Sequence, residues 1–185
     1  MKQPKKITRT AGNILIVFSL LLLTYIYYPL IGLYFFPPKD TFTPTSSLAI
    51  VIPKIHAWAP IIKNVDAWNK DEYAEKLKMG VAHAKGTPLP GEKGVSLLFA
   101  HSSDFPWNIT RNNIAFFKLN QLKKGDNLFV FENGKRKEFV VEKTEEVYPK
   151  EIEFLNDKNN TYLVLQTCTP IGTDWKRLLV FAKPI

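Results

Sequence analysis

Apolar and polar positions divide the chain into one long apolar stretch near its start and a series of short apolar runs after it. The long stretch covers about residues 13–36, contains no charged side chain, and includes the run Leu20-Leu21-Leu22-Leu23. Roughly 20 apolar residues are enough to cross a bilayer as a helix, so residues 13–36 predict a transmembrane anchor. The segment before it, residues 1–12, carries Lys2, Lys5, Lys6 and Arg9, which predicts a cytoplasmic N-terminus and an extracellular remainder.

A cleaved signal peptide is the alternative interpretation of this stretch. Its apolar part is longer than the roughly 7–15 residues of a typical signal core, and no clear small-x-small cleavage site follows it. These two observations favour an uncleaved, single-pass anchor, although Pro29 and Gly32 weaken the outer end of the helix.

The pattern changes to polar and proline-rich over residues 37–47, which predicts a linker, and residues 48–185 then suit one domain with a full core. Within that domain, short apolar runs alternate with turn residues, as in Leu48–Pro53 and Val95–Ala100. Asn133-Gly134 between two further runs is a strong hairpin signal. Only residues 71–79 have a clear helical composition. Many short β runs with little helix predict an all-β, mainly antiparallel barrel or sandwich.

Three side chains with useful chemistry occupy strand ends in this reading. Cys168, the only cysteine, ends one apolar run, and Arg177 begins the next after a short Pro/Gly loop. His101 ends the run Val95–Ala100. A cysteine attacks as the thiolate, which a neighbouring cation favours, and an imidazole can protonate a departing amine. Arg177 could also stabilise an oxyanion. The pattern therefore predicts a cysteine nucleophile at the rim of the sheet.

Each of these residues also has an ordinary explanation when taken alone. Cys168 could be an inert buried thiol, His101 a hydrogen-bonded surface residue, and Arg177 a member of a surface ion pair. An unpaired thiol in an exported chain nevertheless invites a reactive role, because exported cysteines are usually paired.

The charge of the chain and the spacing of its histidines argue against a nucleic-acid-binding protein and against a metal site. The net charge of +8 falls to +4 once the four leading cations are set aside, which is too little to indicate nucleic acid. No two of His56, His83 and His101 have helical ligand spacing, and no acidic cluster accompanies them. We therefore expect no metal and no cofactor.

The run Leu165-Gln166-Thr167-Cys168-Thr169-Pro170, followed by Arg177-Leu178-Leu179-Val180, resembles the signature of sortases, the membrane-anchored cysteine transpeptidases of bacterial surfaces. Ala100-His101-Ser102 stands where the family has its catalytic histidine, although Ala100 replaces the usual glycine. Pro90-Gly91-Glu92 and Leu122 to Asp126 agree in order, and the resemblance covers about residues 48–182. The short loop after Thr169 is similar to housekeeping-like or class D and E types.

The resemblance implies an eight-stranded closed β-barrel with short helices. It also implies a catalytic set of Cys168, His101 and Arg177, acting on surface proteins or pilins that carry a C-terminal sorting signal of Leu-Pro-x-Thr-Gly type. The acyl group would pass through a Cys168 thioester to an amine of a cell-wall precursor or a pilin lysine. His83 matches a position that is not held to be catalytic.

Residues that flank the catalytic set are candidates for substrate binding. Thr167 is expected to support the site by a side-chain hydrogen bond and Leu165 by packing. Loop positions after His101 and Cys168 are candidates for the groove wall, with capping of the barrel core as the alternative for the two tryptophans: Trp107, Ile171 and Trp175.

Two other functions remain open from the sequence. An extracellular cysteine peptidase would give the same thioester to water. A non-enzymatic surface-binding barrel would carry these three residues by accident.

Overall fold

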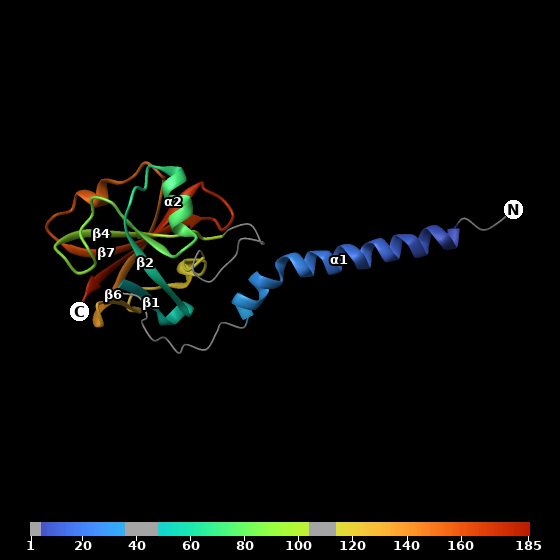
Figure 1. Cartoon of the computed structure of the whole chain (residues 1–185), viewed down its shortest axis with the longest axis horizontal. Helices are drawn as coiled ribbons and strands as arrows, with labels where there is room; N and C mark the ends of the chain where they lie inside the picture. Colours follow the sequence, from blue (N-terminus) through green and yellow to red (C-terminus); the bar gives the residue numbers. More distant parts are fainter. Residues whose placement is uncertain (1–4, 36–47, 104–113) are drawn as a thin grey trace. The chain divides into compact units, whose positions relative to one another are not determined.

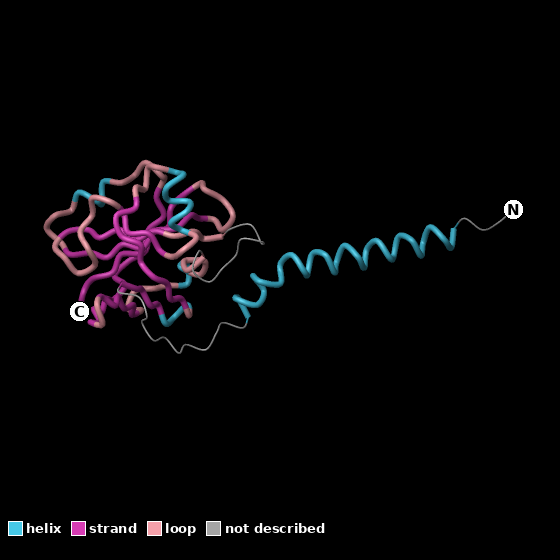
Figure 2. Tube along the Cα trace, viewed as in Figure 1, coloured by secondary structure: helices cyan, strands magenta, loops and turns pink. Residues whose placement is uncertain are grey.

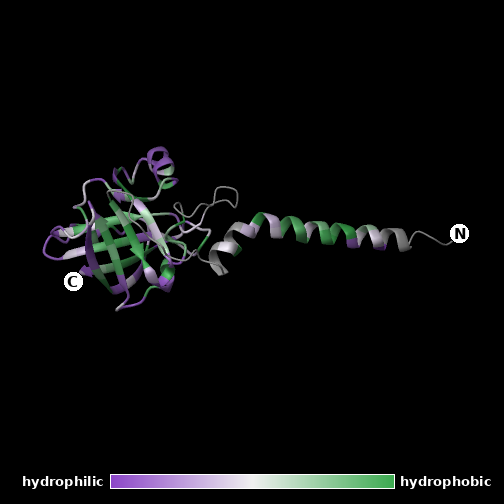
Figure 3. Ribbon diagram, turned by 60° about the horizontal axis from the view of Figure 1, so that its bottom comes forward, coloured by the Kyte–Doolittle hydropathy of each residue, from purple (hydrophilic) through white to green (hydrophobic). Residues whose placement is uncertain are grey.

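This computed structural model describes residues 5–35, 48–103 and 114–185. The first of these ranges is the N-terminal helix. Helix α1 (Lys5–Phe35) begins before the predicted anchor and continues past Pro29 and Gly32. Its segment Arg9–Tyr28 is long and apolar enough to cross a membrane. Figure 3 shows the apolar colouring along the middle of α1. The Thr24 hydroxyl donates to the Leu20 carbonyl at 2.8 Å, so this polar group is satisfied within the helix.

The remaining described residues form a closed barrel of eight strands, as predicted (Figure 1). Neighbouring strands follow the order β1-β2-β3-β4-β7-β8-β6-β5, and β5 pairs with β1 to close the ring. Two of these pairings, β2 with β3 and β4 with β7, are parallel, and the other six are antiparallel. The strands are β1 Leu48–Ile52, β2 Ala57–Val65, β3 Val81–Ala84, β4 Gly94–Phe99, β5 Asn127–Glu132, β6 Lys135–Val147, β7 Thr161–Thr169 and β8 Lys176–Pro184.

Short helices connect these strands, and Figure 2 shows how little of the domain they occupy. The α-helix α2 (Lys70–Leu77) is preceded by Asn69, whose side chain accepts the Glu72 amide at 3.2 Å and so caps the first turn. The other short helices among the described residues are of the 3-10 type: η1 Pro53–Ile55, η3 Leu119–Gln121 and η4 Glu153–Asn156.

The predicted hairpin joins β5 to β6 around Asn133 and Gly134. These residues have φ values of +50° and +79°, which is the pair of left-handed conformations that a two-residue turn of type I′ requires. Asparagine and glycine tolerate that backbone better than other residues, so the turn fixes the register of the two strands.

The core fills the inside of the barrel, where alternate residues of each strand point inward. Its largest fully buried side chains include Phe139, Ile50, Leu128 and Leu165. Strand β8 is buried on both faces, and Phe154 of η4 and Tyr162 of β7 contact Phe181 edge-on, at centroid distances of 5.8 and 5.7 Å. The strand that carries Arg177 is therefore packed on both faces.

A proline within a strand is usually confined to a sheet edge or a bulge, but β2, which contains Pro60, is paired on both sides. Strand β3 pairs with β2 only from Ile61 onward, so Pro60 precedes the ladder on that side. The missing N–H of Pro60 therefore costs no hydrogen bond with β3.

Gly80 provides a test of how closely β2 and the start of β3 approach each other. A Cβ atom at Gly80 would lie 2.3 Å from the Pro60 carbonyl oxygen, a distance that requires backbone movement. We expect Gly80→Ala to reduce the free energy of unfolding by about 1–3 kcal/mol. Chemical denaturation of the full chain in detergent, followed by tryptophan fluorescence, measures this change.

The matched control is Met79→Ala at the neighbouring position, whose side chain is exposed. Equal stability of Gly80→Ala and the wild-type chain would contradict the close approach.

Candidate active site

Cys168 and Arg177 lie directly opposite each other where β7 ends and β8 begins. The antiparallel register pairs Cys168 with Arg177 and Thr169 with Lys176. Side chains of directly paired residues point to the same face of a sheet, so sulfur and guanidinium share one face at the rim of the barrel. Cys168 is a free thiol and is partly exposed.

The guanidinium of Arg177 is held by backbone carbonyls of its own loop. Its Nη1 donates to the Asp174 oxygen at 3.0 Å and to the Lys176 oxygen at 3.2 Å. These bonds fix one edge of the group near the start of β8 and leave its charge in place, because arginine stays protonated.

His101 reaches the same end of the barrel through the parallel pairing of β4 with β7. Phe99 pairs with Gln166, and the Ala100 amide donates to the Gln166 oxygen at 3.1 Å. The Thr167 hydroxyl donates to the Ala100 oxygen at 2.9 Å, which joins the two strand ends by a side chain as well. The ladder ends at Phe99 and Gln166, and His101 follows β4 by two residues at this same end of the barrel.

A pocket of about 390 Å³ opens beside Cys168. Its walls come from the end of β7, the loop after it, the start of β8 and the segment before β5. The lining residues are Ser102, Phe116, Phe117, Asn120, Thr167, Cys168, Thr169, Pro170, Ile171 and Leu178.

The predicted substrate-binding residues fall into different places. Thr167 and Ile171 line the pocket. Leu165 is fully buried in the core and does not line the pocket, and its support of the site by packing stays a prediction. Trp175 is 75% exposed, so it does not cap the barrel core, and it lies outside the lining of this pocket. Trp107 falls outside the described residues, and its role stays a prediction.

Phe116, Phe117 and Asn120 were missed by the sequence analysis. They belong to a segment that contains turns and the 3-10 helix η3. An irregular segment has no periodicity to show which side chains face a pocket, although the polar Asn120 beside two aromatic residues was a weak signal.

The surroundings of Cys168 favour the neutral thiol. Burial raises the pKa of the Cys168 thiol, the Arg177 guanidinium lowers that pKa in part, and the Asp174 carboxylate raises it further. The net result is a pKa above the ordinary value, so the thiolate is a minor species at neutral pH.

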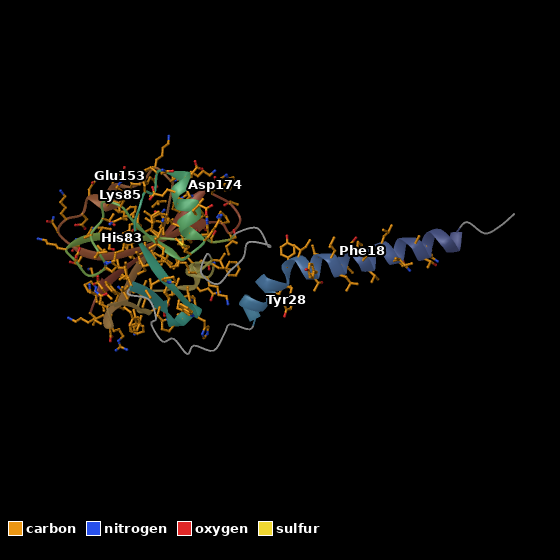
Figure 4. All side chains as sticks on the ribbon, viewed as in Figure 1. Phe18, Tyr28, His83, Lys85, Glu153 and Asp174 are labelled. Atoms are coloured by element: carbon orange, nitrogen blue, oxygen red, sulfur yellow. The ribbon has the colours of Figure 1, made fainter. Side chains whose placement is uncertain are left out.

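His83 and His56 lie elsewhere. His83 is 1% exposed on β3, and its Nδ1 accepts the Asn64 amide at 3.5 Å. Its Nε2 lies 3.0 Å from the Pro88 oxygen and 3.1 Å from the Thr87 hydroxyl, so His83 ties the β3–β4 loop to the barrel. Figure 4 shows His83 on the barrel. His56 is exposed after η1. Neither residue lines the pocket beside Cys168.

A sequence model of the sortase domain matches residues 50–185 of this chain. The chain belongs to the sortase family. The motif residues around Cys168, Arg177 and His101 therefore indicated the correct family from the sequence.

Similar sortases come from several bacteria. Sortase A of Bacillus anthracis is 28% identical over 131 residues, which make up 71% of this chain and 56% of that protein. Sortase D of Bacillus subtilis (strain 168) is 27% identical over 154 residues, or 80% of this chain and 69% of that protein. The crystal structure of sortase C-1 from Actinomyces oris is 33% identical, with a TM-score of 0.63 over 75% of this chain and 72% of that one.

This sortase thus spans just over half of the length of the Bacillus anthracis relative. Proteins named sortase A, C and D match at 28%, 33% and 27% identity, so the expected housekeeping-like or class D and E subclass stays a prediction.

Thr167 provides a test of the link between β7 and the end of β4. We expect Thr167→Val to lower the free energy of unfolding by roughly 1–2 kcal/mol. The substitution keeps the shape of the side chain but removes the hydroxyl that donates a hydrogen bond to the Ala100 carbonyl. Thr167→Ser keeps the donor and should lose less. Denaturant titration compares the three chains, and equal losses in both variants would contradict the importance of this bond.

Arg177 provides a test of the electrostatics at the sulfur. Because the guanidinium lowers the pKa of Cys168, removing it in Arg177→Gln should raise that pKa and reduce the thiolate fraction near neutral pH. We expect iodoacetamide to label native Cys168 roughly two- to tenfold more slowly at pH 8. Lys176→Gln is the control, and an equal slowing there would contradict a specific effect of Arg177.

Proposed function

We propose that this sortase is a cysteine transpeptidase of the cell surface. It would cleave a C-terminal sorting signal of Leu-Pro-x-Thr-Gly type in surface proteins or pilins and join the acyl fragment to an amine. The observation that supports this best is the cross-strand pairing of Arg177 with Cys168, which lines a pocket, within a domain that matches the sortase family.

In the first half of the reaction, the Cys168 thiol passes its proton to His101, and the resulting thiolate attacks the threonine carbonyl of the signal. A carbon–sulfur bond forms, the carbon–nitrogen bond breaks, and His101 gives a proton to the departing amine. Arg177 donates to the oxyanion that develops on the carbonyl oxygen, from a guanidinium already fixed by two loop carbonyls. The product is a thioester on Cys168.

In the second half, an amine nitrogen attacks the thioester carbon. The new carbon–nitrogen bond replaces the carbon–sulfur bond, and His101 takes the proton that the amine loses. The acceptor amine would belong to a peptidoglycan precursor or a pilin lysine. No cofactor takes part in either half.

Helix α1 supports an anchored location for this chemistry. Its apolar segment Arg9–Tyr28 is the length of a membrane span, and cations precede it. The positive-inside rule then gives a cytoplasmic N-terminus, a single pass through the cell membrane and an extracellular catalytic domain.

A labelled sorting peptide tests transfer against hydrolysis. The full chain in detergent is incubated with the peptide, with and without a primary amine such as triglycine, and mass spectrometry identifies the products. We expect an amide product that requires the amine, together with a thioester adduct on Cys168 in the intact chain. Cys168→Ala should lower turnover by at least about a thousandfold.

His101→Ala and Arg177→Ala should lower turnover by roughly a hundredfold or more while the barrel stays folded. Peptide hydrolysis that the amine does not change would favour a cysteine peptidase. Turnover that survives Cys168→Ala would contradict the proposal, and a Cys168 that iodoacetamide labels only after denaturation would favour a binding module.

A further inference from the structure

Four polar side chains are buried among the described residues of the barrel: His83, Ser96, Ser102 and Thr167. Burying a polar group costs free energy unless a hydrogen bond compensates for the lost water. His83 is satisfied by the β3–β4 loop, and the Thr167 hydroxyl donates to the Ala100 oxygen at 2.9 Å. Within the described part of the chain, neither serine hydroxyl has a hydrogen-bond partner.

The two serines differ in what can reach them. Ser96 lies within β4, pairs with Leu163 of β7 and has a fully enclosed oxygen. Ser102 follows β4 by three residues, is 4% exposed and lines the pocket beside Cys168. Its oxygen is not among the fully enclosed ones, so a molecule in the pocket can reach it. Ser102 is therefore a buried polar group whose missing partner can come from the pocket.

The lining of this pocket selects the chemistry of what enters it, because no charged side chain is among the described residues of its walls. Apolar side chains such as Ile171 and Leu178 lie beside the polar ones of Ser102, Asn120 and Thr169. The lining therefore offers no carboxylate to an ammonium group and no cation to a carboxylate. A peptide segment fits it, because a main chain is polar but uncharged, and a hydroxyl can donate to its carbonyl or accept from its amide. The volume of about 390 Å³ lies in the range of about 300–1,000 Å³ that is usual for ligand pockets.

The position of Ser102 is set by the contacts that also place His101. Ala100, two residues before Ser102, is bonded to β7 through both its amide and its carbonyl. Ser102 directly follows His101, so its hydroxyl lies next in the chain to the proposed acid–base residue. A polar group that is fixed before binding loses less conformational freedom when a ligand arrives, and more of its hydrogen bond then contributes to affinity.

We propose that Ser102 is a substrate-binding residue whose hydroxyl forms a hydrogen bond with the main chain of a peptide in the pocket beside Cys168. This inference rests on the proposed function, which supplies two such peptides: the sorting signal and the peptide that carries the acceptor amine. In the free enzyme the hydroxyl is buried without a protein partner, and the bound peptide provides one. The serine thus lowers the stability of the free chain and contributes affinity in the complex.

The test compares the wild type with Ser102→Ala, as full chains in detergent. One arm measures the rate of thioester formation against the concentration of a labelled sorting peptide, without amine. The other arm measures amide product against the concentration of triglycine, at saturating sorting peptide. We expect the half-saturating concentration in at least one arm to rise roughly three- to tenfold, which corresponds to the loss of one hydrogen bond to an uncharged group. The arm that changes identifies the peptide that Ser102 contacts, and no change in either arm overturns the proposal.

Stability without peptide separates a binding role of Ser102 from a structural one. Because a buried hydroxyl without a partner contributes nothing favourable to the free chain, Ser102→Ala should leave the denaturation midpoint unchanged or raise it. A lower midpoint would show that the hydroxyl supports the fold and would contradict the proposal. Ser103→Ala is the matched control, since Ser103 is partly buried and does not line the pocket. It should leave both half-saturating concentrations unchanged, and an equal rise there would contradict a specific contact of Ser102.

Binding to an unreactive chain separates this proposal from the proposed function. In Cys168→Ala, fluorescence polarisation of labelled sorting peptide and of C-terminally labelled triglycine measures affinity without chemistry, with and without Ser102→Ala. Weaker binding after Ser102→Ala, in a protein that never forms an amide product, would support the role of Ser102 and contradict the proposed function. Normal transfer with unchanged affinities and half-saturating concentrations would do the reverse. No binding of either peptide would contradict both.

Discussion

The pairing of β7 with β4 on one side and β8 on the other is the constraint on which the site depends. One strand carries Cys168, and its two neighbours bring His101 and Arg177 to the same end of the barrel. Because β8 is buried on both faces, neither neighbour can slide without exposing apolar side chains. A shift by one residue would also turn Cys168 to the other face of the sheet. The position of the sulfur is thus a property of the core.

The same packing explains why the thiol is poorly ionised. The strand end that fixes Cys168 is also partly buried, and burial disfavours the charged form of a thiol. The Arg177 guanidinium reduces this penalty without removing it. In the proposed function, the reactive ion pair would be a minor population in the free enzyme, and peptide binding would draw on that population.

Much of the barrel could be predicted because its strands obey local rules. The hairpin at Asn133 and Gly134 follows from backbone conformations that few residues tolerate, and the Cys168–Arg177 neighbourhood follows from a short loop between two apolar runs. The parallel pairing of β4 with β7 could not be derived this way. It joins residues that are far apart in the sequence, and no local pattern encodes the strand order. Phe116 and Asn120 were missed for a related reason, because the irregular segment that carries them has no repeating face.

The bonds from Arg177 to the Asp174 and Lys176 carbonyls engage a single terminal nitrogen. The opposite edge of the guanidinium, formed by Nε and Nη2, is a planar pair of donors whose direction is set during folding. A flexible arginine would have to give up rotamer freedom each time it met an incoming carbonyl. In this structure most of that rotamer freedom is already lost before a carbonyl arrives. The side chain can therefore present its two donors in a fixed direction.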